Sequence, residues 1–224
     1  MSEHWLLTCY AAWTGTLTTR RALRMSGWRA LISPIYMPKF SGHPTYDNGC
    51  LVPYMLDNGA WTAHVNNQPF DEVAFLRAVD RWADRADWVV LPDIVGGGMS
   101  SLELSLSYIE RLTGAPLMLA VQDGMTPDNI GALPSQVGGL FVGGTTSWKL
   151  AYAGTWAAYA QARGLWCHVG RVNTMRRIAL CQSIGADSCD GSGVTRFPVT
   201  LDRLNDQRTT TQQRLFNDRP RMTP

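Results

Sequence analysis

The sequence has few cysteines, and they do not form a recognisable framework. Five are present, an odd number, with no CxxC or CxC pair among them. We therefore expect no set of disulfides and favour a reducing compartment. No apolar stretch approaches the ~18 residues that a membrane span needs. The first residues, MSEHWLLTCY, have no basic region before an apolar stretch, as a signal peptide would. These absences predict a soluble, cytoplasmic protein with no membrane partner.

Lysine is also scarce, since Lys39 and Lys149 are the only lysines among 20 basic residues. Arginine suits bidentate contacts with phosphates and bases, but a GC-rich genome would produce the same bias. The formal net charge of +2 is too small to indicate a nucleic-acid partner by itself. Hydrophobic residues make up 45% and charged residues 17% of the chain, which predicts a folded protein.

Metal and phosphate motifs are incomplete. Cys167 stands beside His168, with Cys181 and Cys189 downstream. Adjacent residues of one strand point to opposite faces, so we do not expect these side chains to share a zinc ion. The segment VGGTTS (142–147) could cradle a phosphate at a helix N-terminus, but it lacks the P-loop spacing. We predict neither a metal nor a cofactor.

What the chain does contain is a series of short apolar segments, each followed by a polar or glycine-rich turn. They are residues 4–10, 28–34, 52–58, 87–93, 116–123, 138–144, 165–171 and 185–191. Such segments are typical of strands buried on both faces, as in a parallel sheet. Helical patterns lie between several of them, at 71–86, 100–112, 146–164 and 173–185. In the first of these helices the spacing places Val73, Leu76, Val79 and Trp82 on one face.

The alternation of strands and helices predicts an α/β fold, and eight strands predict a compact (β/α)8 barrel of the TIM type. A doubly wound open sheet is the alternative. Residues 1–224 would form one domain, because no linker or repeat divides them. We expect an irregular loop at 35–51. Residues 199–224 would be a polar, arginine-bearing tail with a last helix and a frayed end.

In such a barrel, catalytic groups gather at the C-terminal ends of the strands. The polar residues there are Asp57, Asp93, Gln122, Asp123, His168 and Asp190, and Gly143 and Gly144 form a turn. A single aspartate after a strand usually caps a helix or makes a turn. Several after different strands predict a common site. His168 could titrate near neutral pH, although a packed histidine is the more ordinary interpretation.

The order of these motifs resembles that of the tRNA-guanine transglycosylase superfamily. The motifs are LDNGAW (56–61), LPDIV (91–95), AVQDG (120–124), FVGGTT (141–146), HVGR (168–171) and GADSCDGSG (185–193). They are similar to a D-S-G-G-aromatic turn, a strand-end Asp, a V-Q-G turn, a G-G turn, a G-V-G turn and a G-x-D-x-x-D segment. The likeness covers residues 52–193 and lies in the succession of motifs, because no single motif is specific.

The resemblance implies a role for each matching residue. Asp190 would be the nucleophile and Asp57 the general acid/base, which agrees with the two-carboxylate chemistry of retaining glycosidases. Trp61 would stack on the bound base, and Asp93 would read N1 and the exocyclic amine of guanine. The base carbonyl would face Gln122 and Gly144. The same base-binding set includes Gly143 and His168.

The chain departs from the tRNA enzymes in several ways. It lacks their C-x-C-x-x-C…H zinc site and is much shorter, and Asn58 and Ala60 replace a serine and a glycine of the first turn. It is most like the small zinc-less DNA-modifying transglycosylases, many of them encoded by phages, which would act in the host cytoplasm. The resemblance thus implies exchange of guanine in DNA for a preQ0-type 7-deazaguanine base through a covalent glycosyl-enzyme. Arg171, Arg196 and Arg203 would contact the nucleic acid.

Other functions stay open at this point. The polymer could be tRNA instead of DNA. The same two acids could hydrolyse an N-glycosidic bond with water, or the barrel could bind nucleic acid without catalysis. A sugar-phosphate enzyme using residues 142–147 is less favoured, because no lysine or metal cluster accompanies that turn.

Overall fold

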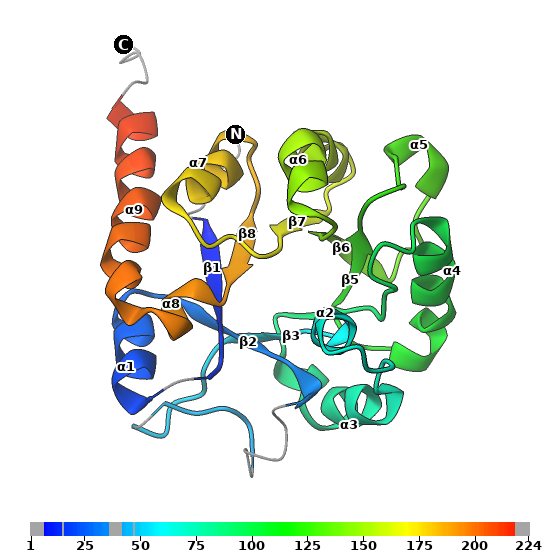
Figure 1. Cartoon of the computed structure of the whole chain (residues 1–224), viewed down its shortest axis with the longest axis horizontal. Coiled ribbons are helices and arrows are strands. Elements are labelled where there is room, and N and C mark those ends of the chain that lie inside the picture. Colours follow the sequence, from blue (N-terminus) through cyan, green and yellow to red (C-terminus); the bar gives the residue numbers. More distant parts are fainter. Residues whose placement is uncertain (1–6, 15, 36–41, 47, 218–224) are drawn as a thin grey trace, which may run out of the picture.

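The structure, a computed structural model, describes residues 7–14, 16–35, 42–46 and 48–217, with side chains as far as Thr209. Eight parallel strands follow one another in chain order and form a closed barrel (Figure 1). The strands are β1 (Thr8–Ala12), β2 (Arg29–Ile32), β3 (Tyr54–Leu56), β4 (Trp88–Val90), β5 (Leu117–Val121), β6 (Val137–Val142), β7 (Trp166–Val169) and β8 (Ser188–Gly191). All eight predicted strands are confirmed, although β1 begins at Thr8 and the predicted residues 4–6 lie outside the described part of the chain. Pairing of β1 with β8 closes the sheet and excludes the doubly wound alternative.

The helices lie outside the barrel, as Figure 1 shows. They are α1 (Leu17–Met25), α2 (Ala60–Val65), α3 (Glu72–Trp82), α4 (Met99–Ser107), α5 (Pro127–Ile130), α6 (Thr146–Ala162), α7 (Met175–Ser183), α8 (Gly193–Arg196) and α9 (Leu201–Asn217). Short 3₁₀ helices follow at Ala83–Arg85, Ile109–Leu112 and Pro198–Thr200. The four predicted helices correspond to α3, α4, α6 and α7, and α9 is the predicted last helix. No described helix is long and apolar enough to cross a membrane.

The predicted buried face of α3 is wrong in part. Val73 is 59% exposed, and the buried side chains are Phe75, Ala78 and Trp82. The face is rotated because the ring of Phe75 packs against Tyr108, with ring centroids 6.2 Å apart. An aromatic ring removes more apolar area from water than a valine does, so it determines which side of the helix faces the core.

The connection from β2 to β3 is irregular where it is described, as predicted. It contains an isolated antiparallel bridge between Thr45 and Leu51. The C-terminal helix α9 packs against α7. It also buries Arg208, whose guanidinium group donates to the carbonyl oxygen of Ser26. The segment 199–217 is therefore part of the folded domain, and the predicted frayed end at 218–224 lies outside the described residues.

The barrel interior has its own small apolar core. Tyr10, Met55, Val90, Met118 and Ala120 form a cluster that is separate from the larger core between strands and helices. At the N-terminal end of the strands, Asp87 accepts hydrogen bonds at 3.0 Å from both the Tyr10 hydroxyl and Nη1 of Arg29. This end of the interior is filled, so an internal cavity can open only toward the other end.

Candidate active site

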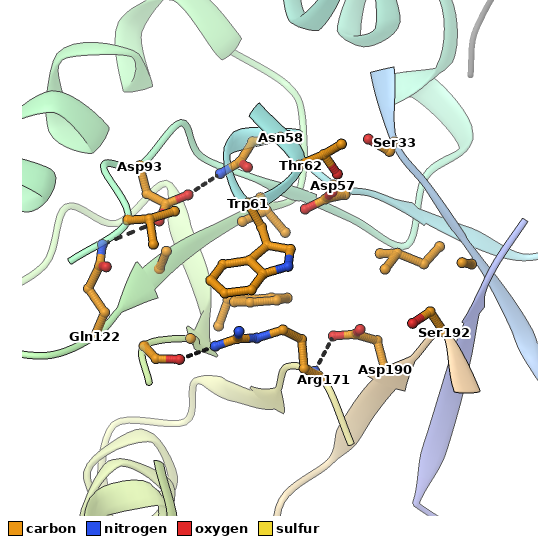
Figure 2. A pocket seen from close by; sticks show the side chains of 18 of the residues that line it. Ser33, Asp57, Asn58, Trp61, Thr62, Asp93, Gln122, Arg171, Asp190 and Ser192 are labelled. Carbon is orange, nitrogen blue, oxygen red and sulfur yellow. Dashed lines mark hydrogen bonds between the residues drawn. The ribbon is translucent and has the colours of Figure 1, made fainter. Parts of the chain in front are cut away.

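A cavity of about 380 Å³ opens at the C-terminal ends of the strands (Figure 2). Its lining comes from all eight strands or the turns that follow them. The residues are Ala12, Thr14, Leu31, Ser33, Asp57, Asn58, Trp61, Thr62, Val90, Asp93, Val95, Ala120, Gln122, Phe141, Gly143, Gly144, Arg171, Asn173, Asp190, Ser192 and Arg196. Sites for small molecules usually have about 300–1,000 Å³. The cavity can therefore hold a single planar base with part of its sugar.

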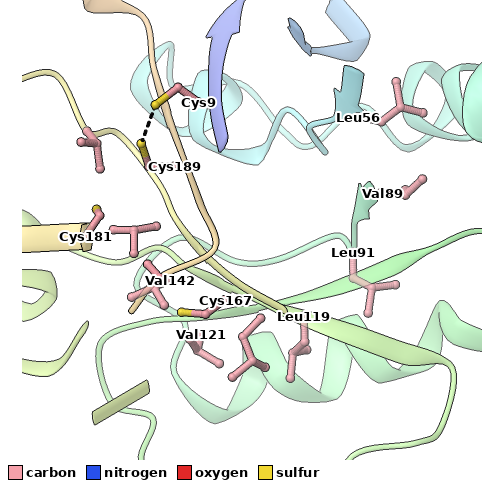
Figure 3. Close-up of a cluster of buried hydrophobic side chains, with 14 of the residues drawn as sticks. Cys9, Leu56, Val89, Leu91, Leu119, Val121, Val142, Cys167, Cys181 and Cys189 are labelled. Carbon is pink, nitrogen blue, oxygen red and sulfur yellow. Dashed lines mark hydrogen bonds between the residues drawn. The ribbon is translucent and has the colours of Figure 1, made fainter. Parts of the chain in front are cut away.

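Asp190 reaches this cavity because side chains alternate along β8. Its neighbour Cys189 faces the helices, where its Sγ lies 3.7 Å from Sγ of Cys9 (Figure 3). The next side chain, Asp190, then points into the barrel and is 5% exposed. The same alternation separates Cys167, in the outer core, from His168, whose ring lies among the interior rings of Tyr10 and Phe141. The described residues contain no group of three or more metal-ligating side chains.

The carboxylate of Asp190 is held in place through hydrogen bonds to only one of its two oxygens. Oδ1 lies 3.0 Å from Nε2 of His168 and accepts from the backbone N–H of Arg171 at 3.3 Å. Figure 2 shows the second of these bonds. Because both contacts fall on Oδ1, Oδ2 is the oxygen that the described contacts leave to face the cavity. A carboxylate fixed in this way can present one oxygen as a nucleophile.

His168 is completely buried behind Asp190 and does not line the cavity. Its ring stacks on Phe141, with centroids 4.8 Å apart. Its Nδ1 lies 2.8 Å from Oγ of Ser188, which also accepts from the indole N–H of Trp166. The Ser188 hydroxyl therefore has its own proton left to donate to Nδ1. When Nδ1 accepts from this hydroxyl, a neutral His168 ring carries its proton on Nε2, where it points to Asp190.

Asp57 follows β3 and lines the same cavity. Burial raises the pKa of Asp57 to about 7, and the neighbouring carboxylates of Asp190 and Asp93 add to this shift. Hydrogen bonds from the backbone N–H groups of Gly59 and Asn58 oppose it. Near neutral pH the carboxyl group of Asp57 is thus divided between its acid and its base form, which suits proton transfer in either direction.

Asp93 is held between two amide side chains, as Figure 2 shows. Nδ2 of Asn58 donates to Oδ1 at 2.6 Å, and Nε2 of Gln122 donates to Oδ2 at 3.2 Å. Gln122 is itself fixed, because its Oε1 accepts from the N–H of Gly96 and its Nε2 also contacts Ser101. Burial raises the pKa of Asp93, although both amide donors and Arg171 oppose the shift. The result is a rigid carboxylate with acceptor capacity directed at the cavity.

Trp61 stands one turn after Asp57, in the first turn of α2, and its side chain is 43% exposed. The guanidinium group of Arg171 lies over the indole, 3.8 Å from the ring centroid, and also donates to the carbonyl oxygen of Gly144. A flat cation thus occupies one face of the aromatic ring. A planar ligand can replace it or bind beside it, because both use the same stacking surface.

The glycine turn after β6 is constrained by Asp123. Gly144 has φ +71°, and a Cβ there would lie 2.5 Å from Oδ2 of Asp123. That carboxylate accepts hydrogen bonds from the backbone N–H and the hydroxyl of Thr145, at 2.6 and 2.7 Å. Asp123 is therefore a turn residue. The N–H of Gly143 is also engaged, since it donates to the carbonyl oxygen of Val121, so Gly144 is the better candidate for a backbone donor.

The structure brings most of the predicted site residues together in one place. Asp57, Trp61, Asp93, Gln122, Gly143, Gly144, Arg171, Asp190 and Arg196 all line the cavity. Arg203 does not: it is exposed on α9. Sequence reasoning missed the contribution of Ser33, which directly follows β2, and of Asn173 and Ser192. The strand-end rule could have found Ser33 and also Ser192, which directly follows β8, whereas Asn173 lies further into the turn after β7.

No family model matches the chain, and no curated protein matches it.

Proposed function

We propose that the protein is a base-exchange transglycosylase, a pentosyltransferase that replaces guanine in DNA by a free 7-deazaguanine base. The observation that carries the proposal is the pair of carboxylates at one cavity. Asp190 has one oxygen anchored and the other exposed to the cavity, whereas burial raises the pKa of Asp57 to about 7. A fixed, anchored carboxylate suits nucleophilic attack, and a carboxyl group that titrates near neutral pH suits acid–base catalysis.

The reaction would have two halves. Oδ2 of Asp190 attacks C1′ of the target nucleoside, the C1′–N9 bond breaks, and the protonated form of Asp57 gives its proton to the departing guanine. The incoming base then loses its N9 proton to the carboxylate of Asp57. Its N9 attacks C1′ of the glycosyl-enzyme, the ester to Asp190 breaks, and both carboxyl groups return to their starting states. General acid–base assistance of this kind contributes about 10²–10⁴-fold in rate.

Recognition of the base would depend on Asp93. A guanine edge offers N1–H and the exocyclic amine as donors, and a carboxylate is an acceptor that can receive both. Asn58 and Gln122 hold the Asp93 carboxylate in place. The structure thus favours a supporting role for Gln122, because both ends of its amide group are engaged. The N–H of Gly144 would face the base carbonyl, and Trp61 would stack on the ring.

The choice of DNA depends on the resemblance to zinc-less DNA-modifying relatives. Two arginines at the cavity, Arg171 and Arg196, suit phosphates beside a flipped nucleotide. Arg203 on α9 is a further candidate for a contact with the duplex. A tRNA substrate would use the same chemistry, so the polymer has to be decided by experiment.

Incorporation of radiolabelled guanine into polymer tests the proposal. Purified protein is incubated with labelled guanine and either duplex DNA or unfractionated tRNA, with Asp190→Asn as the inactive control and Asp87→Asn as the matched control outside the site. Label in DNA that requires Asp190 supports the proposal. Label in tRNA alone overturns the choice of polymer. Release of guanine without incorporation would identify a hydrolase, and binding without either reaction would identify a non-catalytic module.

A further inference from the structure

Lys149 is one of the two lysines in the chain, and only 6% of its surface is exposed. It stands in the first turn of α6, shortly after the N-cap Thr145. Both features disfavour a cation, because burial removes water from the ammonium group and the N-terminal end of a helix carries partial positive charge. Among the described residues no carboxylate lies within ion-pair distance of Nζ. A gain in stability therefore does not explain this lysine.

The hydrogen bond made by Lys149 connects this residue to Asp190 through one peptide group. Nζ donates a hydrogen bond to the carbonyl oxygen of Gly170. This carbonyl belongs to the same peptide group as the N–H of Arg171, which donates to Oδ1 of Asp190 at 3.3 Å. A peptide group is planar, so fixing its oxygen also fixes the direction of its N–H. A charged donor at the oxygen also strengthens the hydrogen bond made at the other end.

The backbone at this peptide needs such support. Arg171 has φ +58°, in the left-handed region that residues other than glycine seldom adopt. A Cβ at residue 170 would lie 2.8 Å from the ring of Phe141, so only glycine fits there. On the far side of Arg171, Nη1 of Arg177 donates to the Arg171 carbonyl oxygen at 3.2 Å. Two cations thus hold two successive carbonyl groups of this turn.

We propose that Lys149 is a positioning residue that fixes the Gly170–Arg171 peptide, so that its N–H holds Oδ1 of Asp190 and Oδ2 faces the cavity. The geometric part of this inference stands on the hydrogen bonds alone, and its catalytic part rests on the proposed function. Lys149 acts through the peptide and does not touch the substrate.

The charged state of Lys149 depends on pH. Burial lowers the pKa of Lys149 to about 8, and the cations of Arg171 and Arg177 add to this, whereas Asp190 and the thiol of Cys181 oppose it. The ammonium form therefore predominates at neutral pH and is lost as the pH rises above 8. The strength of the contact with the Gly170 carbonyl should decrease over the same interval.

Hydrogen exchange at the Arg171 amide tests the geometric part without any assumption about activity. The rate is measured by ¹⁵N NMR in the wild type, in Lys149→Met and in Leu150→Met, a matched change at the adjacent, half-exposed position of α6. We expect at least about 10-fold faster exchange in Lys149→Met and no change in Leu150→Met. Equal rates in all three proteins overturn the proposal.

Steady-state base exchange tests the catalytic part. Lys149→Met should lower kcat up to about 100-fold, because a displaced nucleophile is costly, while KM for the free base stays within about twofold. Lys149→Gln keeps a donor and should recover part of the loss. Wild-type kcat should decline more steeply above pH 8 than kcat of either variant, because only the wild type loses the charge of Lys149 there. Normal kcat in Lys149→Met, or a lower melting temperature as its only defect, overturns the proposal. If the wild type exchanges base on neither polymer, the proposed function fails, and the hydrogen-exchange result still decides the role of Lys149.

Discussion

The two ends of the barrel interior each contain aspartate, and their surroundings are opposite. At the N-terminal end Asp87 receives a hydroxyl and a guanidinium group, each at 3.0 Å. At the C-terminal end Asp57, Asp93 and Asp190 share one cavity, where burial and then the charges of Asp190 and Asp93 raise the pKa of Asp57. At the N-terminal end the carboxylate of Asp87 is paired with donors that include a cation. The other end brings three carboxyl groups together, and the pKa values of Asp57 and Asp93 are raised there, which is an arrangement that folding alone does not favour and that chemistry can use.

Among substitutions of aspartates at the two ends, Asp190→Asn should cause the largest loss of base-exchange activity. The amide keeps the shape of the carboxylate and can still accept from His168, but its nucleophilicity is lost. Base exchange should decrease by at least about 10³-fold, and the covalent glycosyl-enzyme should disappear. Adduct formation is measured by denaturing electrophoresis with labelled DNA. An active Asp190→Asn protein with unchanged adduct would exclude Asp190 as the nucleophile.

Replacing Asp57 by Asn should have the next largest effect, about 10²–10⁴-fold on exchange. Because burial raises the pKa of Asp57 to about 7, transfer of the sugar to the incoming base in the wild type should accelerate as the pH rises through 7 and Asp57 ionises. The variant should lose this dependence. Single-turnover reactions across pH 5.5–8.5 measure it, and an unchanged pH profile in the variant would contradict the assignment.

The same substitution should affect stability in a direction opposite to its effect on rate. A carboxyl group whose pKa is raised in the folded state binds its proton more tightly there than in the unfolded chain. The folded state therefore loses stability as the pH rises from about 4 to 7. Asp57→Asn removes this loss and should increase the free energy of unfolding at pH 8 by about 1–3 kcal/mol. Urea unfolding at pH 5 and pH 8 measures the difference.

Replacing Trp61 by Leu should have a moderate effect that is confined to binding. Stacking on an aromatic side chain contributes about 1–3 kcal/mol per base, so the affinity for the free base should decrease about 10-fold. Trp61→Phe retains a ring and should weaken binding less. Equilibrium dialysis with labelled 7-deazaguanine measures both. Equal affinity in Trp61→Leu and wild type would show that the base stacks elsewhere.

Replacing Asp87 by Asn should have the smallest effect on activity, within about twofold, because the residue lies at the closed end of the barrel. Its ion pair with Arg29 is partly exposed to solvent, with 40% of the Arg29 side chain accessible, so the loss of stability should be only about 1 kcal/mol. Urea unfolding and the exchange assay measure the two quantities. A large loss of activity would show that the two ends are coupled.

Most of the fold could be predicted from the sequence, because parallel strands buried on both faces produce short apolar segments that end in polar turns. The same logic located Asp57, Asp93 and Asp190. The helices that were not predicted had weak signals. Helix α1 contains three arginines and buries only Thr19 and Leu23, and α5 and α8 have four residues each.

The relations between site residues could not be predicted, because they depend on packing between distant segments. The sequence identified His168 as a candidate, but its place behind Asp190 follows from the register of β7 against β8. Lys149 was noticed only because lysine is rare. In the sequence it lies near the start of an ordinary helical pattern, and its contact with Gly170 arises when α6 packs beside β7.

The position of Asp190 on the closing strand has a consequence for synthesis of the protein. A ribosome delivers β1 first and β8 last, and β8 both completes the ring against β1 and supplies Asp190. A nascent chain that ends before residue 188 therefore has an open sheet and no nucleophile. On the proposed function, a growing or truncated chain could not form the glycosyl-enzyme, because reactivity arises in the same step that completes the fold.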